Sequence, residues 1–174
     1  MSPRAKVALV AAVCVAPFAL GTAAYVFDWA SGTPGNYGEL IAPRALSGPP
    51  LDGLRGKWLL VSFDAAACDA YCERKLYLMR QVRAAQGKDA GRVERVWALT
   101  DAARPRDELL GAIEGTHVVA LKEAPALRGF PGNPTDHIFV VDPLGNLMMR
   151  FPRDPDPSRM LKDLQRLLKL SQIG

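Results

Sequence analysis

Along the last two thirds of the chain, the spacing of hydrophobic and polar residues alternates several times between that of a strand and that of a helix. Residues 58–63 (WLLVSF) form a short apolar run, which predicts a strand buried on both faces. Along residues 70–86 apolar positions recur at a spacing of four and three, which predicts one buried helix face at Cys72, Leu76 and Met79. The basic side chains of this helix, Lys75 among them, are expected to point away from that face.

In chain order, the later pattern first predicts a strand at 93–99, a short helix at 107–113, a strand at 117–121 and one helical turn at 124–130. Two strands joined by a turn follow at 137–141 and 147–151, and a closing helix at 157–168. Pro143 and Gly145 suit the early and late positions of the turn between the last two strands. This order predicts an α/β fold with a mixed central sheet flanked by helices. A C-terminal hairpin followed by a helix, with cysteines at the start of the first helix, is typical of a thioredoxin-like fold.

The N-terminal segment is apolar from residue 7 to residue 27, about the length needed for a helix to cross a bilayer. Arg4 and Lys6 precede this segment and Asp28 follows it, so the N-terminus is expected in the cytoplasm and the rest outside. In a bacterium this predicts a single-pass inner-membrane protein with a periplasmic C-terminal domain. Three parts are expected. Residues 1–29 form an N-terminal tip and transmembrane anchor, residues 30–50 a Gly/Pro-rich tether, and residues 51–174 a thioredoxin-like domain.

A cleaved signal peptide is the alternative for this segment. Gly21-Thr22-Ala23 or Thr22-Ala23-Ala24 would serve as a small-residue cleavage site. The apolar run continues past both sites, which favours an uncleaved anchor. Cys14 lies within the run and is interpreted as a small apolar residue facing lipid.

Composition limits the choice of partners. The 174 residues suffice for one membrane segment and one domain of about 120–130 residues, which can bury a normal core. The net charge is +4 and the basic residues are scattered, so no nucleic-acid partner is expected.

Only two cysteines, Cys68 and Cys72, follow the apolar segment, and they are expected in an oxidising compartment. With Cys68 in a loop and Cys72 in the first helical turn, their sulfur atoms can converge and form a disulfide. A helix N-terminus stabilises a thiolate, which can then attack another disulfide or bind a metal ion. An inert structural disulfide is the remaining interpretation of the pair.

His137 begins the strand at 137–141 and is the candidate third ligand of a metal site. Two thiolates and one imidazole make a three-coordinate site, which Cu(I) accepts readily, whereas structural zinc usually needs four ligands. His117 is interpreted as a surface or strand histidine. The methionines are interpreted as packing residues, with Met149 and Met160 in the core and Met148 on the opposite face of the sheet.

These motifs resemble the Sco/SenC family of thioredoxin-like copper proteins from about Pro49 to the C-terminus. The resemblance rests on Gly56-Lys57 before an apolar strand, on the C-x-x-x-C motif, and on an Asp-His pair before the run IFVVDPLG. It implies Cys68, Cys72 and His137 as ligands of copper, Cu(I) or Cu(II). We expect Asp136 to orient the histidine ring. The chain departs from the family in carrying Asp69 where Sco proteins usually have a proline.

The resemblance also implies a role in building the copper centre of cytochrome c oxidase, by delivering copper or by reducing the receiving cysteines. The implied partners are an oxidase subunit or another copper-trafficking protein, and the chain is expected to be a metallochaperone rather than an enzyme. The alternative is a thiol–disulfide oxidoreductase that uses Cys68 and Cys72 on partner cysteines. Redox enzymes of this fold usually carry C-x-x-C and a facing cis-proline, whereas here the spacing is one residue longer and Thr135 follows Pro134.

Overall fold

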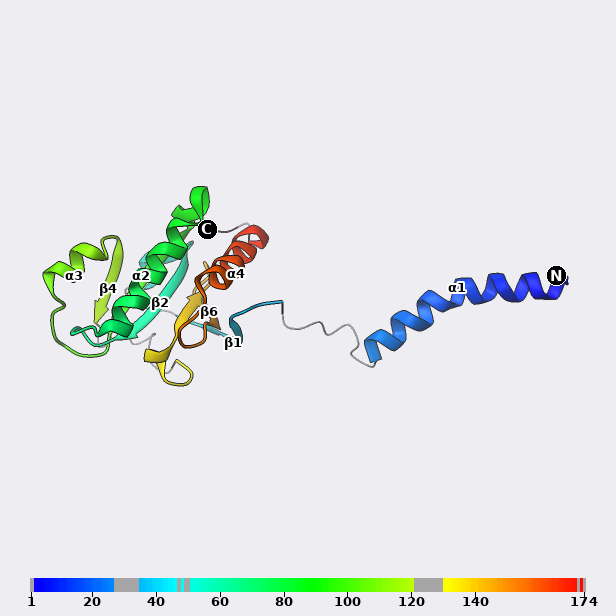
Figure 1. Cartoon of the computed structure of the whole chain (residues 1–174), viewed down its shortest axis with the longest axis horizontal. Helices are drawn as coiled ribbons and strands as arrows, with labels where there is room; N and C mark the ends of the chain where they lie inside the picture. Colours follow the sequence, from blue (N-terminus) through cyan, green and yellow to red (C-terminus); the bar gives the residue numbers. More distant parts are fainter. Residues whose placement is uncertain are drawn as a thin grey trace. The chain divides into compact units, whose positions relative to one another are not determined.

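The structure is a computed structural model, and it describes residues 2–26, 35–46, 48, 51–120, 130–171 and 173 (Figure 1). The chain divides into two compact units, Met1–Gly35 and Asn36–Gly174. In the first unit lies α1 (Pro3–Val26), whose stretch Pro3–Ala24 is long and apolar enough to cross a membrane, with a mean hydropathy of 2.2. Cys14 lies on this helix and is exposed.

The second unit is built on a six-stranded mixed sheet in the order β1-β6-β5-β2-β3-β4. Strands β2, β3 and β4 are parallel, whereas β5 is antiparallel to β2, and the β5–β6 and β6–β1 pairs are also antiparallel. The strand bounds are Glu39–Ala45 (β1), Trp58–Asp64 (β2), Val93–Leu99 (β3), Thr116–Ala120 (β4), Ile138–Val141 (β5) and Asn146–Arg150 (β6). The predicted α/β class and mixed sheet are confirmed.

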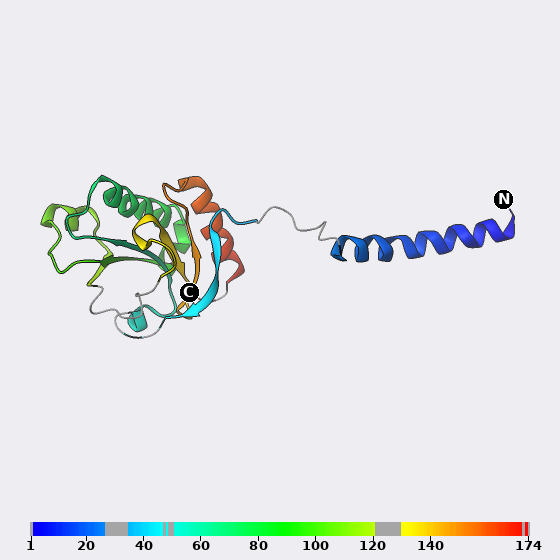
Figure 2. The same cartoon turned by 90° about the horizontal axis from the view of Figure 1, so that it is seen from below.

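One face of the sheet is covered by helices, which Figures 1 and 2 show from two directions. These are α2 (Ala70–Ala84), α3 (Asp107–Ala112) and α4 (Pro157–Leu170). Leu60 of β2 packs with Met79 of α2 and Leu164 of α4, and the three side chains are fully buried. Among the described residues, short 3₁₀ helices lie at Leu51–Leu54 (η1), Gly87–Arg92 (η2) and Pro134–Asp136 (η5).

The opposite face carries a second apolar cluster, in which aromatic rings meet near the end of β2. The Phe63 and Phe139 rings lie 5.8 Å apart, and Phe130 lies 4.8 Å from each. Leu51 of η1 belongs to the same cluster. Strand β2 is therefore buried on both faces, as its unbroken apolar run predicts.

Strand β1 is an addition to the expected elements, because it lies in the stretch 30–50 interpreted as a tether. Its side chains are mostly exposed and it contains Pro43, both of which suit an edge strand and weaken the strand pattern. The start of this strand is held by Asp163 of α4, whose carboxylate accepts the backbone N–H groups of Tyr37 and Gly38 at 2.8 Å.

The methionine interpretations are tested by burial. Met149 and Met160 are fully buried in the core, as predicted. Met148 was expected on the opposite face of the sheet from Met149, and this is wrong, because both pack against the same cluster. The register between β5 and β6 shifts at this point, and the irregularity breaks the simple alternation. The one helical turn expected at 124–130 lies, except for its last residue, outside the described residues.

Candidate functional site

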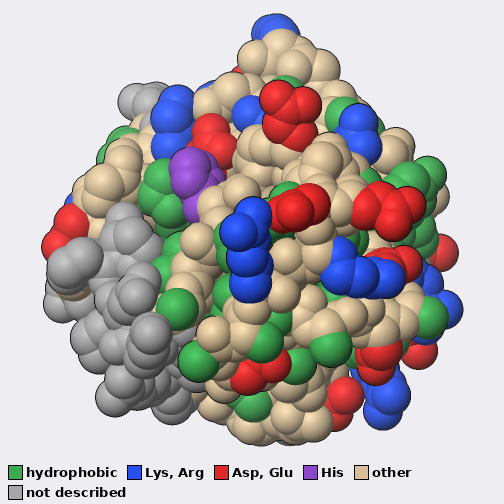
Figure 3. All heavy atoms as spheres, turned by 90° about the vertical axis from the view of Figure 1, so that its left-hand side faces the viewer, with side chains coloured by type: hydrophobic (Ala, Val, Ile, Leu, Met, Phe, Trp, Pro, Cys, Tyr) green, Lys and Arg blue, Asp and Glu red, His purple; other side chains and the backbone are tan. Residues whose placement is uncertain are grey.

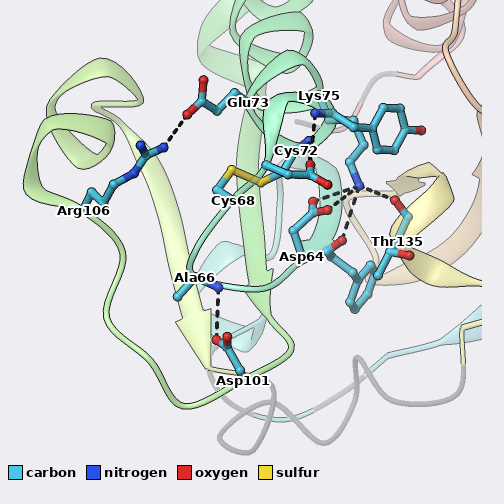
Figure 4. Close-up of a disulfide and its surroundings, with 12 residues drawn as sticks. Asp64, Ala66, Cys68, Cys72, Glu73, Lys75, Asp101, Arg106 and Thr135 are labelled. Carbon is cyan, nitrogen blue, oxygen red and sulfur yellow. Dashed lines mark hydrogen bonds and ion pairs between the residues drawn. A yellow bond between two sulfur atoms is a disulfide. The ribbon is translucent and has the colours of Figure 1, made fainter.

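Cys68 and Cys72 form a disulfide at the N-terminus of α2, with their Cα atoms 5.2 Å apart (Figure 4). Cys68 has a φ of 45°, a left-handed conformation that turns the loop after β2 into the helix. Both residues are buried, with exposed fractions of 5% and 1%. The convergence of the two sulfur atoms, which the spacing predicts, is present.

Asp69, which stands where Sco proteins usually carry a proline, is the N-cap of α2. One of its carboxylate oxygens accepts the backbone N–H groups of Tyr71 and Cys72, at 3.0 and 2.9 Å. A side-chain oxygen in this position satisfies N–H groups that a helix leaves free in its first turn. The cap therefore uses two of the donors that the sequence analysis assigned to thiolate stabilisation.

The disulfide is covered by the segment that includes α3. Its cysteines belong to a buried cluster with Trp97 and Leu99 of β3 and Leu109 and Ile113 of the α3 region. Figure 4 shows two polar contacts that hold the cover, Arg106 with Glu73 on α2, and Ala66 N–H with the Asp101 carboxylate at 3.0 Å.

A groove of about 450 Å³ runs between α2 and α3, floored by Leu76 and Leu109. On the side of the molecule seen in Figure 3, acidic and basic side chains are interspersed and form no patch of one sign. A partner that approaches the disulfide from this side would therefore meet a mixed surface.

The sheet places His137 at the same end of its strands as the cysteine motif. The motif follows the end of β2, and His137 immediately precedes β5. Because β2 and β5 are antiparallel neighbours with Ser62 opposite Ile138, the end of one strand lies beside the start of the other. Residues 65 or more positions apart in the sequence are thus brought to one corner of the fold.

Two side chains of α2 bridge this corner directly. The Tyr71 hydroxyl donates to the backbone carbonyl of Asp136 at 2.9 Å. The Lys75 ammonium donates to the backbone carbonyl of Thr135, as Figure 4 shows. The helix that carries Cys72 therefore also holds the two residues that precede His137.

The His137 ring is oriented by a backbone carbonyl. Its Nδ1 lies 2.8 Å from the carbonyl oxygen of Phe151, which can only accept, so Nδ1 carries the proton and Nε2 keeps its lone pair. Gly132 lies next to Nε2, where an added Cβ would come within 3.9 Å. This arrangement leaves Nε2 as the nitrogen that can bind a metal ion.

Asp136, which was expected to orient the ring, has other partners in this structure. Its carboxylate accepts from the Asn133 side-chain amide at 2.9 Å and lies 3.6 Å from an Arg153 nitrogen. The sequence reasoning missed Phe151, and a backbone carbonyl leaves no signal in residue identity. A role of Asp136 toward His137 remains a prediction.

A buried ion pair lies beneath the disulfide, and the sequence reasoning missed it. Lys75 was expected to point away from the buried face, but its side chain is only 1% exposed and its Nζ lies 2.8 Å from the Asp64 carboxylate. Nζ also donates to the carbonyl of Phe63 at 3.3 Å. Burial raises the pKa of Asp64 to about 6, against the opposing effect of Lys75.

The metal-ligand prediction concerns a reduced form of this site. Within the described parts of the chain, no three His, Cys, Asp or Glu side chains are arranged to hold a metal ion. In this structure Cys68 and Cys72 are bonded to each other, and metal binding requires free thiolates. Two thiolates and the His137 Nε2 would suit a soft ion such as Cu(I). His117 lies on β4, is partly exposed and contacts Glu94 at 3.4 Å, as a surface histidine would.

Comparison with known proteins supports the fold. The family model described as "Transmembrane-like, thioredoxin-like, C-terminal domain" matches residues 58–171. No curated protein matches the chain significantly.

Solved structures with a similar fold include Sco proteins. Yeast Sco1 with copper bound has 16% identity and a TM-score of 0.58, over 80% of this chain and 96% of that one. Apo Sco1 from Thermus thermophilus has 21% identity and a TM-score of 0.54, over 80% and 99%. ScoI from Bradyrhizobium japonicum with copper bound has 21% identity and a TM-score of 0.54, over 74% and 98%. The thioredoxin-like fold expected from the sequence, and its likeness to Sco proteins, are confirmed.

Proposed function

Because the chain belongs to the family of transmembrane-like, thioredoxin-like C-terminal domains, we propose that it is a membrane-anchored protein that carries copper for assembly of the copper centre of cytochrome c oxidase. The observation that carries the proposal is the convergence of the Cys68–Cys72 disulfide and the start of β5 at one corner of the sheet. Two similar structures, yeast Sco1 and Bradyrhizobium japonicum ScoI, were solved with copper bound.

In the proposed mechanism the disulfide is first reduced by a partner dithiol. The partner supplies two electrons and two protons, so that Cys68 and Cys72 become thiols and the partner becomes a disulfide. The two cysteines then lose their protons as they bind one copper ion as cargo, and His137 contributes Nε2 as the third ligand. The Phe151 carbonyl keeps the proton on Nδ1 and so keeps Nε2 free for the ion.

The proposed location is the bacterial inner membrane, with α1 as an uncleaved anchor and the domain on the periplasmic side. Support comes from the length and hydropathy of α1 and from Arg4 and Lys6 at its N-terminal end, because basic residues favour the cytoplasmic side. The proposed recipients are an oxidase subunit or another copper-trafficking protein, whose cysteines or histidines would accept the ion.

A thiol–disulfide oxidoreductase is the second candidate, and the disulfide at the N-terminus of α2 favours it. In this function Cys68 and Cys72 would exchange their disulfide with partner cysteines, and His137 would contribute no bond. The two candidates therefore differ in whether His137 is needed.

Copper titration of the full chain in detergent micelles separates the two candidates. The protein is reduced, freed of reductant without oxygen and titrated with Cu(I) against a competing chelator. We expect one copper per chain, and His137→Ala should weaken binding by more than the ~10–100-fold that loss of a ligand's hydrogen-bond partner costs. His117→Ala, the matched control, should bind as the wild type does.

Equal affinities of the His137→Ala and wild-type proteins would remove the three-ligand proposal. Rapid reduction of a disulfide-bonded test protein by the reduced chain, without tight copper binding, would establish the second candidate instead.

A further inference from the structure

We propose that Tyr71 and Lys75 of α2 are positioning residues that hold His137 beside the cysteine pair. The contact that carries the proposal is a double attachment of α2 to the backbone immediately before His137. The inference rests on the proposed function, since it assigns these residues to the same metal site. Neither residue belongs to the ligand set predicted from the sequence.

Tyr71 immediately precedes Cys72 and reaches across the corner to the Asp136 carbonyl, at 2.9 Å. Its ring is flanked by three cationic side chains, Lys75 at 4.9 Å, Arg153 at 5.2 Å and Arg74 at 5.5 Å from the ring centre. A phenol hydroxyl is a proton donor at neutral pH, and here the acceptor is a backbone carbonyl. The ring packing fixes the direction in which this hydroxyl points.

Lys75 lies one helical turn beyond Tyr71 and binds the backbone one residue earlier, at Thr135. An ammonium group has three donors, and here they meet the Asp64 carboxylate, the Phe63 carbonyl and the Thr135 carbonyl. These partners belong to β2 and η5, so the Lys75 side chain joins α2 to both of these segments. Because the group is fully buried, releasing the Thr135 carbonyl would leave one ammonium donor without a partner, which disfavours movement of this backbone.

The attachments to α2 and the Phe151 carbonyl act on His137 from two sides. Backbone contacts fix Thr135 and Asp136, the residues that lead into His137, while Phe151 fixes the ring through Nδ1. The distance from the imidazole to Cys72 is then set by the helix that carries Cys72. A ligand held in place before binding loses less conformational freedom when the ion arrives, and affinity rises accordingly.

Tyr71→Phe in the full-length protein tests the proposal, because it removes the hydrogen bond to the Asp136 carbonyl and keeps the ring. Tyr77→Phe is the matched control, since Tyr77 lies on the same helix with its side chain in solvent. We expect Tyr71→Phe to weaken Cu(I) binding about tenfold, as loss of an indirect partner of a ligand does. The same change in a His137→Ala background should have no further effect, because the residue acts through His137.

A measurement on the metal-free protein keeps the inference separate from the proposed function. Hydrogen exchange of the His137 amide and the NMR signals of its ring should show a looser segment in Tyr71→Phe and no change in Tyr77→Phe. If this holds while the wild type binds no copper, the proposed function fails and the positioning role stands. If neither exchange nor affinity responds to Tyr71→Phe, or if the affinity loss persists without His137, the inference is wrong.

The pair of substitutions Lys75→Met and Asp64→Asn extends the test to the second attachment. It removes the ammonium without leaving a buried carboxylate charge, and it should loosen the same amide and weaken copper binding in the same direction. A variant with native unfolding behaviour and an unchanged His137 signal would contradict the role assigned to Lys75.

Discussion

Asp64 and Lys75 form a buried ion pair beneath the disulfide, with the carboxylate and the ammonium 2.8 Å apart. The pair joins the end of the central strand β2 to the helix that begins with the cysteine motif. Burial makes the two charges dependent on each other, because the ammonium is removed from water and the carboxylate largely so. Stability, pH dependence and the geometry of the site therefore all depend on this contact.

Lys75→Met should destabilise the domain by about 3–5 kcal/mol, because it leaves the Asp64 carboxylate buried without its partner. Urea unfolding followed by the fluorescence of buried Trp58 and Trp97 measures the loss. Arg74→Met on the same helix is the control, since it breaks the exposed pair with Asp154 and a contact with the Tyr71 ring, and should cost at most about 2 kcal/mol. Equal losses in the free energy of unfolding for the two substitutions would show that the buried pair contributes no more to stability than the exposed contacts do.

The raised pKa of Asp64 predicts a specific pH dependence of stability. Its pKa rises from 3.8, the ordinary value of a hydrated aspartate, to about 6 in the fold, so the folded state binds the proton more tightly. This contribution is complete below pH 4 and is lost as the pH rises through 6. The melting temperature of the wild type relative to Asp64→Asn should therefore fall between pH 4 and pH 6, and a constant difference would contradict the prediction.

The contact between Arg106 and Glu73 is expected to slow access to the disulfide. Arg106→Ala should speed reduction by a small thiol up to about fivefold, since an exposed ion pair contributes at most about 1 kcal/mol. Arg104→Ala, which breaks a more exposed pair with Asp107, should leave the rate unchanged. A rapid-mixing assay of free thiols measures both rates, and a parallel response in the two variants would mean that Arg106 does not hold the cover.

Replacing the helix cap should change thiol reactivity and stability in opposite directions. Asp69→Ala should cost about 1 kcal/mol of stability through loss of the cap. It also frees the N–H groups of Tyr71 and Cys72, so alkylation of the reduced cysteines at neutral pH should become faster. Asp69→Ser retains a cap without a charge and should keep wild-type stability; slower alkylation in Asp69→Ala would contradict this assignment.

The sequence predicts most strands and helices of this domain because their apolar spacing is regular. Strand β2 carries an unbroken apolar run and helix α4 carries an apolar stripe of helical period, and tertiary packing agrees with both. The spacing of Cys68 and Cys72 likewise predicts their convergence, because a loop residue and a first-turn residue of the same helix are close neighbours.

Features that depend on distant partners were not predictable in the same way. Lysine is usually a surface residue, so the sequence gives no sign that Lys75 is buried. Its burial is explained by its contacts with the Asp64 carboxylate and with the backbone carbonyls of Phe63 and Thr135. The orientation of His137 depends on the backbone of Phe151, which any residue could provide. Strand β1 escapes detection because an exposed edge strand needs no apolar alternation.

The attachment of β1 determines where the chain enters the sheet. Glu39 pairs with Arg150, and Arg150 pairs with Phe139, two residues beyond His137, so the chain enters the domain at the corner that holds the site. Asp163 anchors that entry through Tyr37 and Gly38. The first residues of the domain and the predicted ligand His137 therefore lie at the same end of the sheet, and both are held there by neighbouring strands of that sheet.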